Sequence, residues 1–372
     1  MERNTSGDYI VSTQEEYNNA VKNRKKPIVI ENTADFISVH TDVTVGKNGR
    51  CKTEGKTPVV ITAKENAIVT AEGKAHVAGF NNANIIAKGN CKVELHDEAF
   101  GNCFEHCNIT LKGNSKIAAD GNCTVHAYDE ALVSASGSSK VYSYQKATAK
   151  GSDITTITAK DNCIVYATDN CKVQASDNCL VFAEKNAKIV SQDNCLVMTN
   201  GNPDITIHDK CEHLNLDKVD EKNVMGALKQ MAQSKAVVER PLVAIQILKD
   251  NIPPTRKEAV NRRLNTMGLK DQTAIKNHLF SLIEAEPAIK NQTPAQNFEK
   301  QLETARKTGY VQGVCECVAA VGNEQNLGKK LLTEMNVNRD MAKKFAKPET
   351  FKALENGIFA QQKQEQNQSI KR

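Results

Sequence analysis

Residues 59–202 form eighteen consecutive eight-residue units in unbroken register, and this repeat constrains the fold more than any other feature of the chain. The units that begin at Cys171 and Cys179 read Cys-Lys-Val-Gln-Ala-Ser-Asp-Asn and Cys-Leu-Val-Phe-Ala-Glu-Lys-Asn. Their first, third and fifth positions are apolar or small, whereas the second and fourth are mostly polar or variable. A period of two is typical of a half-buried strand, so each unit predicts one short strand followed by a corner.

The inward positions of the units predict a thin core. Position three is Val or Ile in 16 of the 18 units, and the exceptions are Gly101 and Ala149. Position one is mostly Ala or Cys, and position five is small except at Leu95 and Leu111. Position eight is Asn in eleven units, usually after Asp or Gly, and we expect these residues to turn the chain at each corner.

The spacing of similar residues indicates how many units make one coil. Two units would give a flattened coil, and three would give a triangular one. Cys91, Cys107 and Cys123 recur at every second unit, as do the expected outward-facing Tyr166 and Phe182. The sequence therefore favours a right-handed parallel β-solenoid with 16-residue coils, with 24 as the alternative, and the units alone would make nine coils.

The segments on either side of the repeats predict other structures. Residues 1–58 read as an N-terminal cap of strand, amphipathic helix and strand, at Tyr9–Val11, Gln14–Asn23 and Pro27–Ile30. This order resembles the cap of right-handed parallel β-helix proteins such as pectate lyases, and the resemblance concerns the cap alone. The solenoid is expected to span residues 59–215.

Helical periodicity replaces the repeat in residues 216–358, which predict an α-helical domain. The polar tail, residues 359–372, cannot bury apolar surface and is expected to be disordered. The expected helices are Asn223–Ala236, Pro241–Asn251, Arg256–Met267, Gln272–Glu284, Pro294–Lys307, Val311–Val321, Gln325–Met335, Arg339–Ala346 and Pro348–Asn356.

The repeat also resembles a known kind of sequence. Residues 122–129, Asn-Cys-Thr-Val-His-Ala-Tyr-Asp, are similar to the Gly-Asn-Ala-Thr-Val-x-Ala-Tyr-Asp repeats found in many proteins of bacteria, their phages and mobile elements. This resemblance implies a phage or mobile-element setting, in which small non-enzymatic proteins often bind a host defence component.

No catalytic, cofactor-binding or metal-binding residues are assigned. The repeats contain no arginine, and their aspartates occupy corner positions that turn chemistry explains. Cys103 and Cys107 suggest zinc, but both are expected to point inward, where a nearby outward histidine such as His106 fits tetrahedral coordination poorly. Eight of the twelve cysteines lie at inward positions in place of Ala, so we expect reduced core thiols.

The remaining candidates are surfaces. Aromatic side chains at outward positions of a rigid sheet make a candidate protein-binding surface of Tyr128, Tyr142, Tyr144, Tyr166 and Phe182. Packing of the helical domain would equally account for the last two. The densest basic group makes candidate nucleic-acid contacts of Arg256, Lys257, Arg262, Arg263, Lys270 and Lys276.

These features favour a non-enzymatic protein-binding or scaffold module, in a sharper form a phage or mobile-element inhibitor of a bacterial defence complex, with a protein or ribonucleoprotein as partner. The alternative is a nucleic-acid-binding protein that uses the basic helices. A self-assembling rod and a polysaccharide-active enzyme are less favoured. The chain has no apolar N-terminal signal and no run of 18 apolar residues, so we expect no membrane contact, a cytoplasmic location in a bacterial host cell, and a monomer or lateral homodimer.

Overall fold

The computed structural model describes residues 2–23, 26–53, 55, 58–284, 311, 315, 318, 319, 332, 337 and 339–359. The chain divides into two compact units, Met1–Glu284 and Ala285–Arg372, which are described separately. The boundaries expected near residues 58 and 215 both lie inside the first unit, so the repeats and the first helices belong to one body.

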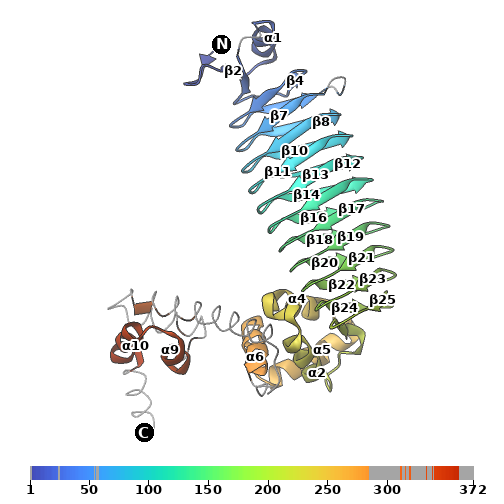
Figure 1. The fold of residues 1–372 in the computed structure, drawn as a ribbon, viewed down its shortest axis with the longest axis vertical. Helices are drawn as coiled ribbons and strands as arrows, with labels where there is room; N and C mark the ends of the chain where they lie inside the picture. Colours follow the sequence, from blue (N-terminus) through green and yellow to red (C-terminus); the bar gives the residue numbers. More distant parts are fainter. Residues whose placement is uncertain are drawn as a thin grey trace. The chain divides into compact units, whose positions relative to one another are not determined.

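The first unit is built on a parallel β-solenoid with two sheets (Figure 1). Sheet A contains fourteen strands, which are β1 (Glu2–Arg3), β2 (Tyr9–Val11), β3 (Ile28–Ile30), β5 (Val43–Val45), β7 (Val60–Ala63), β9 (His76–Gly79), β11 (Lys92–Leu95), β13 (Asn108–Leu111), β15 (Thr124–Ala127), β17 (Lys140–Ser143), β19 (Thr156–Ala159), β21 (Lys172–Ala175), β23 (Lys188–Ser191) and β25 (Asp204–Ile207). Sheet B contains twelve, which are β4 (Ile37–Val39), β6 (Arg50–Thr53), β8 (Ile68–Gly73), β10 (Asn84–Gly89), β12 (Phe100–Glu105), β14 (Lys116–Gly121), β16 (Leu132–Ala135), β18 (Thr148–Gly151), β20 (Ile164–Ala167), β22 (Leu180–Glu184), β24 (Leu196–Asn200) and β26 (Glu212–Asn215).

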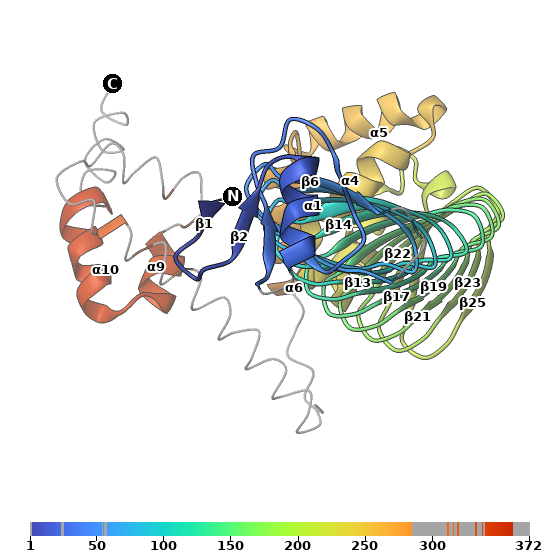
Figure 2. The ribbon, with the colours of Figure 1, turned by 90° about the horizontal axis from the view of Figure 1, so that it is seen from above.

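The pairing register confirms the 16-residue coil. Within the repeats, each strand pairs in parallel with the strand two units away, so Val93 lies beside Val77 and Ile109. Successive strands alternate between the two sheets, and the view along the rod shows flattened coils with two long sides (Figure 2). The 24-residue alternative is therefore wrong.

The solenoid is longer than the regular repeats. The eighteen units form β7 to β24, whereas the whole solenoid makes about 13 turns. Its first coils have irregular lengths, because the step from Ile37 to its partner Cys51 is shorter than a regular coil, and the step from Val43 to Ile61 is longer. Residues 28–53 therefore already form solenoid strands, although the sequence there lacks the eight-residue pattern and reads as part of a cap.

The solenoid core is continuous and almost completely shielded from solvent. The Val and Ile side chains at position three of the units are 0–4% exposed, and Ala and Cys fill the rows beside them. Burying such a row of β-branched side chains is the main source of stability for this thin core.

The corners differ in one detail from the expected turn. The residue with positive φ is the seventh of each unit, as at Asp161 (φ 66°) and Gly121 (φ 93°), and the Asn at position eight follows it. The side chain of the seventh residue also ties neighbouring coils together. The N–H of Gln145 donates to Oδ2 of Asp161 at 2.7 Å, and that of Asp161 donates to Asp177 at 3.1 Å.

Helix α1 (Gln14–Asn23) lies at the N-terminal end of the solenoid (Figure 2). Tyr17 of this helix is fully buried in the solenoid core cluster. Its hydroxyl accepts a hydrogen bond from the N–H of His40 at 3.0 Å. The strand–helix–strand order at Tyr9–Ile30 thus agrees with the sequence pattern.

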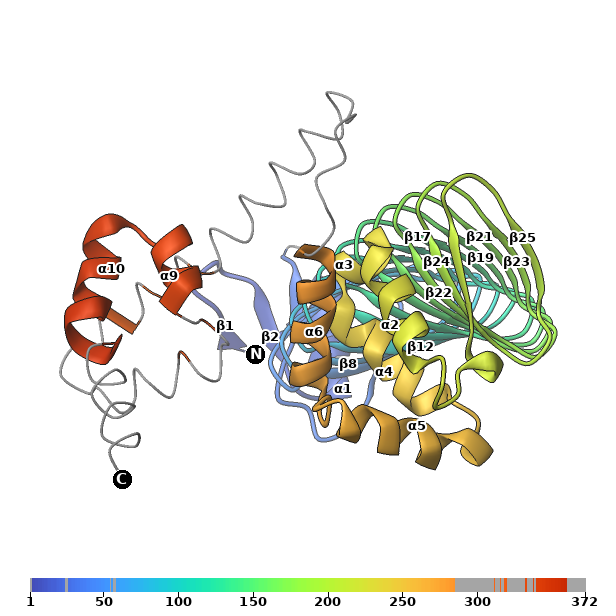
Figure 3. The ribbon, with the colours of Figure 1, turned by 90° about the horizontal axis from the view of Figure 1, so that it is seen from below.

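A helical layer covers the C-terminal part of sheet B (Figure 3). It consists of the short helix η1 (Leu216–Lys218), α2 (Val224–Gln233), α3 (Lys235–Glu239), α4 (Pro241–Asn251), α5 (Pro254–Thr266) and α6 (Gln272–Glu284). Its apolar side chains join Ile164, Leu180 and Leu196 of sheet B in a second core cluster. Among the helices that the structure describes, none is long and apolar enough to cross a membrane.

In the second unit the structure describes α9 (Arg339–Phe345), α10 (Pro348–Leu354) and a π-helical turn at Glu355–Phe359. Buried apolar residues, including Val311, Leu332 and Leu354, form a separate small core. Arg339 forms an ion pair with Glu355. The expected helices at residues 294–307 and 325–335, most of the one at 311–321, and the tail after residue 359 lie outside the described residues.

Candidate protein-binding surface

Two stacked aromatic pairs lie on the outer face of sheet A. The rings of Tyr128 and Tyr144 stack with centroids 5.1 Å apart, and those of His126 and Tyr142 stack at 4.9 Å. All four side chains are half-buried. We refer to these four residues as the aromatic face.

The repeat itself assembles the aromatic face. His126 and Tyr142 occupy position four of their units, directly beside each other in β15 and β17, and Tyr128 and Tyr144 occupy position six. Since one coil contains two units, residues at the same position of every second unit stack along the rod. The same rule explains the stacked rings of Phe80 and His96, 4.8 Å apart.

Sequence reasoning selected the three tyrosines but missed His126. The signal that could have found it is present, because His126 precedes Tyr142 by one coil length and shares its position in the unit. Side chains at equivalent positions of neighbouring strands contact each other on one face of the sheet, so these rings present a continuous surface.

The rim of the aromatic face carries both signs of charge. Lys112, Lys140 and Lys160 are exposed around it, and the exposed carboxylates Asp129 and Asp161 lie at the adjoining corner. An aromatic centre with a mixed polar rim is typical of protein interfaces. Nucleic-acid interfaces are instead strongly positive.

The other two candidate residues, Tyr166 and Phe182, lie on sheet B. Phe182 is only 5% exposed, because the helical layer covers it, and Tyr166 packs at the edge of the same cluster. Their rings contact each other in an edge-on arrangement, with centroids 6.2 Å apart. The structure therefore separates the five candidates into two faces, and the packing alternative accounts for these two.

Sheet B also has an uncovered apolar area further toward the N-terminus. Ile86, Phe100 and Phe104 are 36–43% exposed on β10 and β12. Ile86 and Phe100 stand in the same outward positions that contact the helical layer in later coils. The repeat pattern also identifies Phe100 and Phe104 as outward or corner aromatic residues, although the five-residue candidate surface leaves them out, and Ile86 was not identified.

The basic candidates surround α5 and α6 rather than lining one face. Val260 and Leu264 of α5 are buried. At about 100° per residue, Arg256 and Arg263 lie together on one flank of this buried side, and Arg262 lies on the opposite side of the helix. Lys257 and Lys270 are exposed, and Lys276 lies over the ring of Phe280. The structure thus distributes the six residues over α5, α6 and the segment between them.

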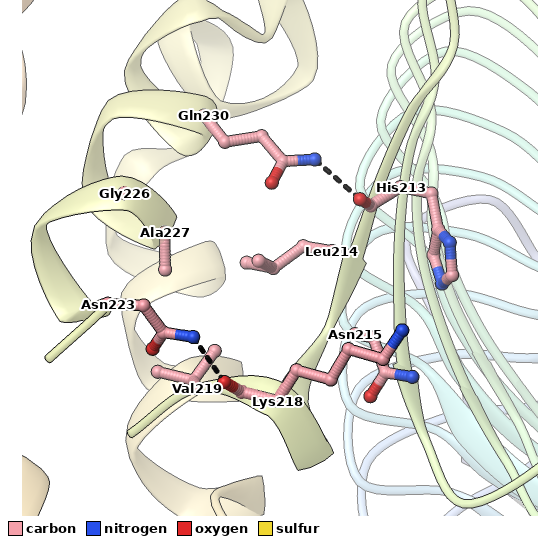
Figure 4. Close-up of a pocket in the computed structure, with 9 residues that line it drawn as sticks. All are labelled: His213, Leu214, Asn215, Lys218, Val219, Asn223, Gly226, Ala227 and Gln230. Atoms are coloured by element: carbon pink, nitrogen blue, oxygen red, sulfur yellow. Dashed lines mark hydrogen bonds between the residues drawn. The ribbon is translucent and has the colours of Figure 1, made fainter. Parts of the chain in front are cut away.

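Two cavities lie between the solenoid and the helices. One, of about 330 Å³, separates β26 from α2, and Figure 4 shows Gln230 donating to the backbone carbonyl of His213 across it. The other, of about 400 Å³, is lined by Glu130, Lys146 and Arg240. Neither lining contains a pair of carboxylates, a serine or a cysteine.

The described cysteines are unpaired, and all except the half-buried Cys211 are buried. Burial raises the pKa of Cys51 and of Cys171 to about 12. A hydrogen bond with Cys107, together with burial, raises the pKa of Cys103 above its ordinary range. These thiols behave as core side chains, and no group of three metal-ligating side chains is found in the described ranges.

Comparison of the chain with known protein families, with curated proteins and with solved structures finds no match.

Proposed function

We propose that this chain is a non-enzymatic protein-binding scaffold that contacts its partner through the aromatic face of sheet A. This proposal rests on two stacked pairs of half-buried rings on a rigid sheet, Tyr128 with Tyr144 and His126 with Tyr142. Rigid aromatic side chains lose little conformational entropy on binding, which is why they dominate the energetics of protein interfaces.

Sheet B supports the proposal by example. Its outward residues Tyr166 and Phe182 occupy position four of their units, as His126 and Tyr142 do on sheet A, and they pack against the chain's own helical layer. An outward row of this solenoid can therefore hold a packed helical partner. The aromatic face of sheet A lacks such a covering within the described part of the chain.

The sharper form of the proposal rests on the resemblance of the repeats. In that form, the protein is a phage or mobile-element inhibitor that binds a protein or ribonucleoprotein defence complex in the cytoplasm of a bacterial host. The two uncovered outer regions, on sheet A and on β10 and β12 of sheet B, would give such a scaffold two contact areas.

An affinity pull-down of the full chain from host lysate, with and without nuclease, tests the proposal. The variant Tyr128→Ser plus Tyr144→Ser should lose a stoichiometric protein partner at least ten-fold. Gln174→Ser, an exposed change on the same sheet, is the matched control and should retain that partner. Equal recovery by both variants would contradict the proposal.

The nuclease arm addresses nucleic-acid binding. One observation favours this second candidate, because Lys257, Arg262, Arg263 and Lys270 are exposed without a carboxylate in salt-bridge distance among the described residues. Binding through these residues should weaken steeply with added salt and with Arg262→Ala plus Arg263→Ala. Partners that survive nuclease and high salt would remove this candidate.

A further inference from the structure

The solenoid has four sheet ends: side chains cap the end strand at two of them, and sheet A ends at its N-terminus in the two-residue antiparallel strand β1. At the N-terminal end of sheet B, the side chain of Gln14 accepts from the N–H of Ser38 at 2.7 Å and donates to its carbonyl at 3.2 Å. At the N-terminal end of sheet A, the short antiparallel strand β1 pairs with β2. At the C-terminal end of sheet B, Gln230 of α2 donates to the carbonyl of His213 in β26 (Figure 4).

The fourth end, the outer edge of β25, is open. This strand pairs with β23 and has no neighbour on its other side among the described residues. In the view from below, the helical layer lies beside sheet B and leaves β25 uncovered (Figure 3). At this end of the solenoid, the helical layer therefore covers sheet B only.

The backbone groups on this edge follow from the pattern of the preceding coil. The carbonyls of Ala187 and Ser191 accept from the N–H groups of Asp204 and His208 in the next coil. One coil later, the equivalent positions are Pro203 and Ile207, and Ile205 lies in the same alternating phase. The N–H and C=O groups of Ile205 and Ile207 therefore point away from β23, on the side where sheet A ends. In the described structure these two residues have no hydrogen bond on that side.

The side chains at this end are also incompletely covered. Ile205 and Ile207 are half-buried, whereas their counterparts in the preceding coil, Ile189 and Ser191, are 1% and 0% exposed. Unpaired backbone groups next to half-exposed isoleucines form a template for one more strand.

We propose that the open edge of β25 binds an extended segment of a partner protein by strand addition. The bound segment would contribute about four residues, of which alternate ones are small or β-branched and lie against Ile205 and Ile207. Asp204, His208 and Lys210 are exposed around the edge and limit the pairing to this short stretch.

A single strand fits this end better than a second solenoid does. Helix α2 and its cavity lie directly below β26, next to the open edge. A second copy would bring both of its sheets to this end and would meet α2, whereas one added strand needs space below β25 alone. The edge is separate from the aromatic face, so its test does not depend on the tyrosines.

The experiment uses the full chain and a labelled peptide with the sequence of residues 187–194, Ala-Lys-Ile-Val-Ser-Gln-Asp-Asn. This is the unit that contains β23, which pairs with β25 from the other side. Fluorescence anisotropy should show saturable binding of this peptide and none of a scrambled peptide. Hydrogen exchange should show that the amides of Ile205 and Ile207 exchange rapidly in the free protein and become protected on binding.

The key variant is Ile205→Pro, which removes one outward N–H and leaves the pairing with β23 intact, because edge strands tolerate proline on their free side. We expect at least a ten-fold weaker peptide affinity for Ile205→Pro and an unchanged affinity for Ile205→Val and for Tyr128→Ser plus Tyr144→Ser. Absence of peptide binding, equal binding by Ile205→Pro, or protected Ile205 and Ile207 amides in the free protein would overturn the proposal. Concentration-dependent self-association that Ile205→Pro abolishes would also overturn it, because the occupant would then be a second copy.

Discussion

The outer faces of sheets A and B share a repeat but have different surroundings. Inward residues are similar in the two sheets, since Val and Ile form the central row of both apart from Gly101 and Ala149. The outward residues, in contrast, differ between the two sheets. The last coils of sheet B carry Ile164, Leu180 and Leu196 under the helical layer, whereas sheet A carries polar residues and stacked rings. The inward positions thus define the rod, and the outward positions determine which partner each face can hold.

The largest expected effect is a difference between the two faces in how much stability the loss of one aromatic ring costs. Phe182→Ala on sheet B removes a buried ring between solenoid and helices, and we expect it to lower the free energy of unfolding by about 3–5 kcal/mol. Tyr142→Ala on sheet A removes a half-buried ring and should cost about 1 kcal/mol. Urea unfolding followed by circular dichroism measures both, and equal losses would contradict the difference between the faces.

The second prediction concerns the central rows, where both exceptions to Val and Ile, Gly101 and Ala149, lie in sheet B. A Cβ atom on Gly101 would lie 2.0 Å from the carbonyl oxygen of Ile85, so the backbone would have to move. We expect Gly101→Val to destabilise the protein by about 1–3 kcal/mol, although Val is the commonest residue at this position. Thermal unfolding measures it, with the exposed change Asn102→Ala as control; a stabilising Gly101→Val would show that the coil can relax.

Gly101 also shows what the repeat pattern can and cannot predict. The parallel solenoid, its 16-residue coils and the strands β7 to β24 follow from the pattern, because equivalent inward residues recur without interruption. The irregular coils around Ile37 and Val43 do not, because one is shorter and the other longer than the regular coil, which leaves no period to detect. The close approach at Gly101 depends on the exact path of the backbone, which no residue type reveals.

The candidate surface was predictable in composition but not in position. Tyr128, Tyr142 and Tyr144 were identifiable as outward aromatic residues, and the structure brings them together with His126. Tyr166 and Phe182 obey the same pattern but lie on the opposite sheet, under helices that begin only after the last solenoid strand. The alternation of strands gives each residue a face, whereas only tertiary packing decides which face is covered.

A third prediction measures how tightly the aromatic face is organised. In a double-mutant cycle with Tyr128→Ala and Tyr144→Ala, the stacked rings should give a coupling energy of about 0.5–1.5 kcal/mol. The pair Tyr128 and Gln174 lies several coils apart and serves as control, with no coupling expected. A coupling near zero for the stacked pair would mean that the rings contribute independently and that the face is less rigid than its geometry indicates.

The smallest expected effect is a difference in the pH dependence of local opening between β26 and β25, the C-terminal end strands of the two sheets. Partial burial of the ring, and to a lesser extent the positive charge of Lys218, lowers the pKa of His213, whose ring lies 2.9 Å from the hydroxyl of Thr199. The unfolded chain, with an ordinary histidine pKa of about 6.5, therefore binds more protons than the folded end does. The stability that the neutral ring contributes is present above this pH and is lost as the pH falls below about 6.5.

Hydrogen exchange, corrected for its intrinsic pH dependence, should then show faster opening of β26 at pH 5.5 than at pH 7.5 and little change in β25. His213→Asn should abolish the pH response of β26. A response that persists in this variant would assign it to another group and remove the difference between the two ends.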